Sequence, residues 1–202
     1  MEETLSRRER KKRETRLRLV EAALRLFCQH GYDATTVEQI ADAADVAKGT
    51  FFNYFETKEA ILPSIAEWRI QQLGKALLPE QGAPTSPVAR IKLALCLVAK
   101  DPLSGPLLMR RLFAAGMHRP DVHPVYALTN LLSEQVRQAQ AAGEIRADLD
   151  PIYLGNMIRA LFFQQMMMWH HGYRPITLPA LLDEMVDMLL GGVAGPKWRQ
   201  SS

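Results

Sequence analysis

Three polar side chains in one short segment have the chemistry needed to recognise base pairs. Lys48, Thr50 and Asn53 all lie in the run KGTFFNYF. An asparagine amide can pair with adenine through two hydrogen bonds, and a lysine ammonium can donate to the acceptor atoms of guanine. Gly49, which has no side chain, would let the backbone approach a ligand closely. These residues predict direct contact with the edges of DNA bases.

The surrounding residues predict the elements that would hold this segment in place. Residues 35–62 are expected to form two short helices with a tight turn between them, followed by the start of a third helix. Either Thr35 or Thr36 can cap the first helix. Glu38 and Gln39 lie three residues after each, so either choice completes a capping box. These signals are typical of a helix-turn-helix, whose second helix lies in the major groove.

The turn and the second helix carry three further signals. Asp45 interrupts the helical pattern, and aspartate tolerates the left-handed backbone of a tight turn, though less well than glycine. Ala47 precedes the second helix and cannot cap it, so about 1 kcal/mol of capping free energy is absent. Phe51 and Phe55 are four residues apart, so we expect both on the buried face of that helix.

A resemblance to a known family is carried by the run GYDATTVEQIA…VAKGTFFNYFETKEAIL and the residues before it from Arg13 onward. This stretch is similar to the DNA-binding domain of the tetracycline-repressor (TetR) family of bacterial transcription regulators. The resemblance implies a dimer that binds a palindromic operator through the second helix of the motif. It also implies that Thr36 with the start of its helix, Tyr54 and Lys58 clamp phosphates. Helix N-termini suit this role because their free N–H groups attract anions.

Three residues depart from the family's pattern. The family usually has a tyrosine at the position of Phe52, and that hydroxyl contacts DNA. Phe52 can offer only an apolar contact, such as one with a thymine methyl. Asp45 stands where the family has glycine and brings a negative charge near DNA, and Ala47 stands where a serine often caps the helix. The predicted DNA-binding residues are Thr36, Lys48, Gly49, Thr50, Phe52, Asn53, Tyr54 and Lys58.

The amino-terminal residues are strongly basic. Residues 1–18 hold eight lysines or arginines against four glutamates, a local excess of four positive charges. This run is either a solvated, partly disordered tail or an arm that contacts phosphates or the minor groove. We expect a basic tail at residues 1–10, a helix-turn-helix DNA-binding domain at 11–62, and an effector-binding and dimerisation domain at 63–202.

The whole chain has the composition of a soluble globular protein. Of its 202 residues 48% are hydrophobic and 23% are charged, and the net charge of +3 says little about partners. The charged amino terminus has no apolar stretch behind it, so we expect no signal peptide. The longest apolar run, near Leu93–Ala99, is far too short for a membrane span. Cys28 and Cys96 lie in apolar helical patterns and are expected to be reduced core residues of a cytoplasmic protein.

No segment alternates as a strand would, so we expect an all-α protein with about nine helices. The helix that starts near Lys58 would link the DNA-binding head to the body and act as a lever between them. The expected helices are residues 11–30, 37–44, 48–55, 58–78, 88–99, 107–116, 125–142, 151–171 and 179–190.

The last two helices carry more apolar residues than one buried face requires. A wide apolar surface indicates a second partner surface, so we predict a four-helix homodimer interface. The alternative is that both helices are central in a single core. The predicted interface residues are Met157, Leu161, Met168, Leu182, Met185 and Leu189.

The family resemblance implies an effector pocket within the body. Methionine and aromatic side chains line adaptable apolar pockets, although they also form ordinary cores. The candidate lining residues are Trp68, Met109, Phe113, Met117, Tyr126, Phe162, Met166 and Trp169. The histidines give no convincing metal site, and we expect neither a metal nor a cofactor.

An enzyme is not expected, because the chain has no nucleophile elbow, phosphate loop or HExxH motif. We predict a sequence-specific transcriptional regulator, a repressor that a small apolar ligand releases from a palindromic operator in double-stranded DNA. The alternative is a DNA-binding architectural or partner-recruiting factor without a small-molecule effector. A cavity in the body, or a ligand-induced shift of the melting temperature, would distinguish the two.

Overall fold

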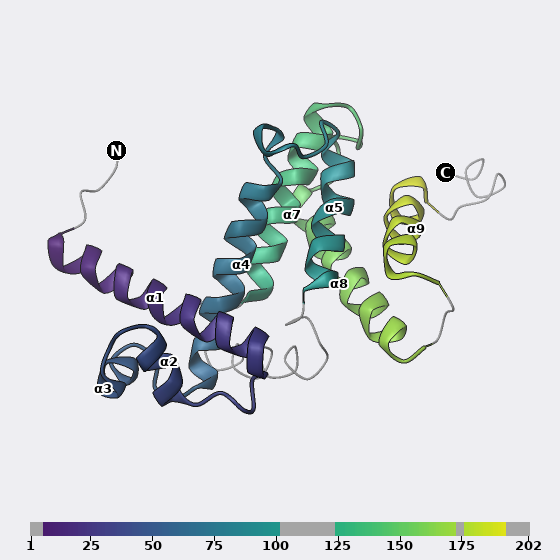
Figure 1. The fold of residues 1–202 in the computed structure, drawn as a ribbon. Helices are drawn as coiled ribbons and strands as arrows, with labels where there is room; N and C mark the ends of the chain where they lie inside the picture. Colours follow the sequence, from purple (N-terminus) through teal and green to yellow (C-terminus); the bar gives the residue numbers. More distant parts are fainter. Residues whose placement is uncertain (1–5, 102–123, 173–175, 193–202) are drawn as a thin grey trace, which may run out of the picture. The chain divides into compact units, whose positions relative to one another are not determined.

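The computed structural model describes residues 6–101, 124–172 and 176–192. Within these ranges the chain forms eight α-helices and two 3-10 helices and has no strand, which confirms the all-α prediction (Figure 1). The helix predicted at 107–116 lies outside the described residues. The elements are α1 (Arg7–His30), α2 (Val37–Ala43), α3 (Lys48–Phe52), η1 (Glu59–Ile61), α4 (Leu62–Ala76), η2 (Pro79–Gln81), α5 (Pro87–Lys100), α7 (Pro124–Ala141), α8 (Pro151–His170) and α9 (Leu178–Gly191).

The contacts divide the chain into two compact units. Unit 1 includes residues 6–69, and unit 2 includes residues 70–101, 125–172 and 176–192. Helix α4 therefore begins in unit 1 and ends in unit 2. None of the helices among the described residues is long and apolar enough to cross a membrane.

Unit 1 begins with a longer helix than expected, because α1 starts at Arg7 rather than Lys11. Ser6 and Glu9 form a capping box: the Ser6 hydroxyl accepts from the Glu9 N–H at 3.2 Å, and the Glu9 carboxylate accepts from the Ser6 N–H at 2.9 Å. This box satisfies two N–H groups that would otherwise lack partners. It extends the helix into the stretch predicted as a tail.

The core of unit 1 uses only the second half of α1. Residues 7–18 are exposed apart from the partly buried Thr15, and the buried face starts at Leu19. Helix α2 packs against this face and against α3. Cys28 is exposed and was wrongly expected in the core, because it lies next to the buried Phe27 but on the outer side of α1.

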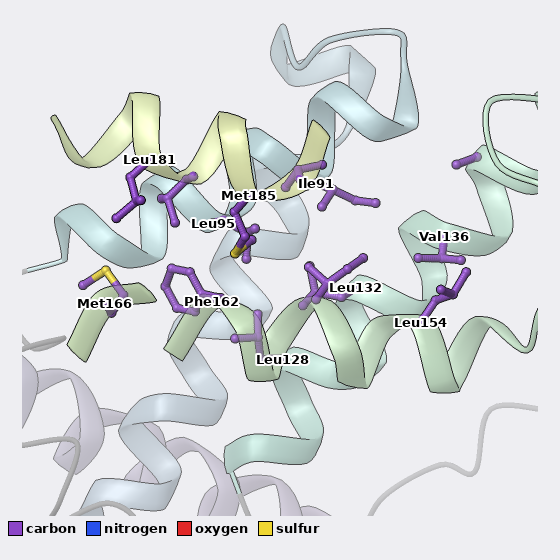
Figure 2. Close-up of a cluster of buried hydrophobic side chains, with 14 of the residues drawn as sticks. Ile91, Leu95, Leu128, Leu132, Val136, Leu154, Phe162, Met166, Leu181 and Met185 are labelled. Atoms are coloured by element: carbon purple, nitrogen blue, oxygen red, sulfur yellow. The ribbon is translucent and has the colours of Figure 1, made fainter. Parts of the chain in front are cut away.

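Unit 2 has a continuous apolar core formed by α5, α7, α8 and α9. Figure 2 shows side chains from all four helices meeting in this cluster, and α9 packs against both α5 and α8. Its largest fully buried members include Ile91, Leu132, Ile158, Phe162 and Leu182. The cluster explains the apolar surplus of α8 and α9 in part, since both helices are central in this core.

A buried arginine joins the loop before α5 to α7 through hydrogen bonds. Arg90 is 6% exposed, and its guanidinium donates to the side-chain oxygens of Gln135 at 2.8 Å and Gln138 at 2.6 Å. It also donates to the carbonyls of Pro84 and Thr85, both at 3.3 Å. These neutral acceptors satisfy the donors of a buried cation, which otherwise would be costly to desolvate.

Candidate nucleic-acid interface

The start of α2 is capped as the residue types predicted. The Thr36 hydroxyl accepts from the Gln39 N–H at 3.2 Å, and the Gln39 side chain accepts from the Thr36 N–H at 2.8 Å. Of the two capping boxes that the sequence allowed, the structure has this one. Thr35 is instead buried, and its hydroxyl donates to the Gly31 carbonyl at 2.8 Å. The exposed Thr36 therefore marks the N-terminal end of α2 on the surface.

The turn between α2 and α3 depends on a left-handed residue. Asp45 has φ 55°, and among the described residues it is the one non-glycine with positive φ. The Val46 N–H then donates to the Ala41 carbonyl at 3.0 Å and closes the turn. Ala47 makes no side-chain cap to α3, as expected.

Helix α3 is shorter than predicted. It ends at Phe52, and Asn53 is its C-cap. One further helical hydrogen bond, from the Phe55 N–H to the Phe51 carbonyl at 2.9 Å, extends into the following turn. Phe51 and Phe55 are 0% and 3% exposed, which confirms that both belong to the core. Their burial fixes which side of α3 remains at the surface.

The outer side of α3 carries the residues predicted to contact DNA. Gly49 and Asn53 are exposed, and Thr50 and Tyr54 are partly buried. A Cβ at Gly49 would meet no atom within 4 Å, so the surface above it is open. Phe52 is 45% exposed and its ring lies edge-on to Phe51. An exposed Phe52 is free to make the apolar contact predicted for it.

Lys48 is held by a neighbour that the sequence did not point to. Its ammonium forms an ion pair with the Glu38 carboxylate of α2, and both side chains are about half exposed. The hydrogen bond from Lys48 lowers the pKa of Glu38 below its ordinary value. Glu38 is therefore charged at neutral pH, and its carboxylate occupies the lysine that was predicted to contact DNA.

Replacing Glu38 with glutamine should raise the affinity for specific and random duplexes alike. The substitution removes a negative charge from the predicted DNA-binding surface and frees Lys48, and both effects favour a polyanion of any sequence. Fluorescence anisotropy titrations at several salt concentrations would measure the gain. The control is Glu21→Gln, which removes the same charge from an exposed position on α1. An equal gain in the control would show that net charge alone is responsible.

Lys58 has an internal role that the sequence analysis missed. Its ammonium donates to the carbonyls of Tyr32 at 3.0 Å and Thr35 at 2.9 Å, and it lies 4.4 Å from the centre of the Tyr32 ring. The Tyr32 hydroxyl in turn donates to the Glu59 carboxylate at 2.8 Å. These bonds tie the segment between α1 and α2 to the residues before α4. A phosphate contact by Lys58 remains a prediction.

The predicted pocket residues have varied environments. Phe162 and Met166 are buried in the core of unit 2, and Trp169 packs against that core while its indole N–H donates to the Ile176 carbonyl at 3.1 Å. Tyr126 is 58% exposed. Trp68 is partly buried on the part of α4 that belongs to unit 1. Met109, Phe113 and Met117 lie outside the described residues.

The predicted interface residues divide into two groups. Leu182 and Met185 are only 1% and 2% exposed because they belong to the core of the chain itself, so they offer no surface to a partner. Met157, Leu161, Met168 and Leu189 are partly buried. Other apolar side chains of α8 and α9, which belong to the apolar surplus predicted to face a partner, are well exposed: Ile152, Tyr153, Met167 and Met188.

Comparison with known proteins agrees with this geometry. A family model described as bacterial regulatory proteins, tetR family, matches residues 19–65. The transcriptional regulator TcmR of Streptomyces glaucescens is 52% identical over 54 residues, a match that spans 27% of this chain and 24% of TcmR. The fatty acid metabolism regulator protein of Bacillus subtilis is 25% identical over 192 residues, covering 91% of this chain and 98% of that protein.

A solved structure extends the likeness to both units. The crystal structure of FadR from Thermus thermophilus, a TetR-family transcriptional repressor in complex with lauroyl-CoA, matches with a TM-score of 0.67 and 25% identity. The match covers 89% of this chain and 95% of FadR. The matched proteins are transcriptional regulators, so together with the turn and second helix described above they define this chain as a helix-turn-helix transcriptional regulator. Residues 19–65 of this chain match the DNA-binding domain of the tetR family of bacterial regulatory proteins, and the likeness to single regulators continues along nearly the whole chain.

Proposed function

We propose that this regulator is a cytoplasmic homodimeric repressor that leaves a palindromic operator when a fatty acyl-CoA binds. One observation carries the ligand class: similarity along nearly the whole chain to a fatty acid metabolism regulator and to a repressor solved with lauroyl-CoA. The long apolar tail of such a ligand suits a helical body rich in methionine and aromatic residues.

In this proposal α3 reads base edges in the major groove. Lys48, Thr50 and Asn53 provide donors and acceptors, Gly49 allows close approach, and Phe52 contacts a thymine methyl. Phosphates on either side are held by Thr36, Tyr54 and Lys58. The exposure of Gly49 and Asn53 beside a fully buried Phe51 supports this arrangement, since one side of α3 is anchored and the other is open.

A dimer follows from the same reasoning. Two recognition helices on one duplex require a two-fold arrangement, which a palindromic operator mirrors. The exposed large apolar side chains of α8 and α9 support an interface on these helices, because a partner would remove them from water. Helix α4 belongs to both units and is the proposed lever. A ligand that binds one state about 100-fold more tightly supplies about 2.7 kcal/mol per site to move it.

Lauroyl-CoA should raise the melting temperature of the purified protein and release it from its operator. The operator duplex is obtained by selection from a random library, and release is followed by fluorescence anisotropy. Free coenzyme A and laurate serve as matched controls, since each carries only one half of the ligand. Release by laurate alone would identify a simple fatty-acid ligand. Operator binding that responds to none of the three would favour the architectural or partner-recruiting alternative.

A further inference from the structure

The exposed half of α1 and the end of α3 enclose an open groove within unit 1. Its volume is about 690 Å³. The two helices contribute residues of complementary kinds, with long cations from α1 and uncharged polar groups from α3 and the residues after it. The lining residues are Ser6, Arg8, Glu9, Lys11, Lys12, Thr15, Thr50, Asn53 and Tyr54.

The groove has a net positive charge that is not neutralised locally. Three cations line it, Arg8, Lys11 and Lys12, and among the described residues none of them takes part in an ion pair. Glu9 is the one acidic group in the lining, and its carboxylate accepts from the Ser6 N–H in the capping box at 2.9 Å. The carboxylate is thereby held at the helix terminus, and the cations remain available to an outside anion.

The position of each basic residue on the helix determines whether its side chain lines the groove. Arg8, Lys11, Lys12 and Thr15 follow the spacing i, i+3, i+4 and i+7, which places them along one side of a helix. The other basic residues of the exposed half, such as Arg13 and Arg18, do not line the groove. Because α1 is already helical here, the arrangement of charges exists before any ligand binds.

We propose that this groove binds the sugar-phosphate backbone of the same duplex that α3 reads. The inference rests on the proposed DNA-binding function and adds residues of α1 to it. Thr50 and Asn53 belong both to the groove and to the predicted base-reading set, so a strand next to α3 would pass the cations. Lysine, arginine and hydroxyl side chains are the usual partners of phosphate oxygens. An acidic protein partner is less suitable, because the lining offers no exposed apolar anchor.

The test compares two double variants of the full-length protein, Lys11→Ala/Lys12→Ala and Arg13→Ala/Arg18→Ala. Each removes two positive charges from exposed positions of α1, and alanine keeps the helix. Binding to the selected operator and to a scrambled duplex is measured across a salt series. The salt slope is the steepness with which the logarithm of the binding constant falls as the logarithm of the salt concentration rises. The first variant should reduce this slope by about 1.8 units per bound protomer on both duplexes, because two phosphate contacts are lost. The second should leave the slope close to that of the parent.

Phosphate ethylation interference on the operator gives an independent readout. Lys11→Ala/Lys12→Ala should lose one cluster of sensitive phosphates, and Lys11→Arg/Lys12→Arg should retain it. Equal losses in both alanine variants would overturn the proposal in favour of a general charge effect, and an unchanged slope in the first would overturn it outright. Absence of duplex binding by the parent protein would instead overturn the proposed function and this inference with it. Circular dichroism checks that α1 stays helical.

Discussion

Replacing Phe162 with alanine should lower the free energy of unfolding by about 3–5 kcal/mol, the usual cost of truncating a buried phenylalanine. The side chain is 1% exposed in the core of unit 2, and its ring lies 5.3 Å from that of Phe163. Chemical denaturation followed by circular dichroism measures the loss. The control Gln164→Ala changes an exposed residue of the same helix and is measured at the same protein concentration. It should alter stability by no more than about 0.5 kcal/mol.

This result bears on the predicted pocket, because Phe162 was a candidate lining residue. A side chain that faces an open cavity leaves little new void when it is truncated, so the loss would be well under the value for a packed core. A loss close to that of the control would contradict the core assignment. Repeating the measurement with lauroyl-CoA present would then show whether the truncation weakens ligand stabilisation, as mass action requires of a lining residue.

Replacing Lys58 with methionine should destabilise the protein by about 1–3 kcal/mol, because the partly buried Thr35 carbonyl loses the Lys58 donor and the Tyr32 carbonyl keeps only the Thr35 N–H at 3.3 Å. Methionine retains an apolar stem, so the change isolates the ammonium group. The segment that precedes α2 loses its anchor, and operator affinity should fall with it. Thermal and chemical unfolding without DNA measure the first effect, and anisotropy measures the second.

The salt slope separates the two roles of Lys58. A phosphate contact that is lost should lower the slope by about one unit per protomer, whereas a purely internal role leaves it unchanged. The control Arg18→Met removes one charge from an exposed position in unit 1 and should leave stability nearly intact. Unaltered stability in Lys58→Met would contradict the hydrogen bonds to Tyr32 and Thr35 as a source of stability. An unaltered slope would contradict the phosphate role.

Local signals in the sequence were sufficient for much of unit 1. Threonine followed three residues later by glutamine predicted the capping box of α2, and Asp45 was correctly expected to adopt a left-handed backbone. The spacing of Phe51 and Phe55 predicted their burial. Each of these depends on residues close in the chain. The capping box at Ser6 and Glu9 has the same signature, and it was missed because the basic composition around it suggested a tail.

Features that depend on distant residues could not be predicted in this way. The hydrogen bonds of Lys58 join residues that are 23 and 26 positions apart, and no local pattern encodes such a pair. The pair between Lys48 and Glu38 depends on how α2 and α3 cross. In unit 2 an apolar side chain such as Leu182 looks the same in sequence whether it faces its own core or a second chain. The packing of α9 against α5 and α8 decides that question.

The helical state of residues 7–18 has a consequence for how the regulator would sense DNA shape. A flexible tail can follow a backbone of any curvature, but a helix holds its cations at set distances from α3 within one compact unit. A rigid pair of contacts is satisfied at full strength only by a duplex whose groove width and bend bring the phosphates to those positions. Operators with easily deformed steps outside the bases read by α3 would then be preferred, although no side chain touches those bases.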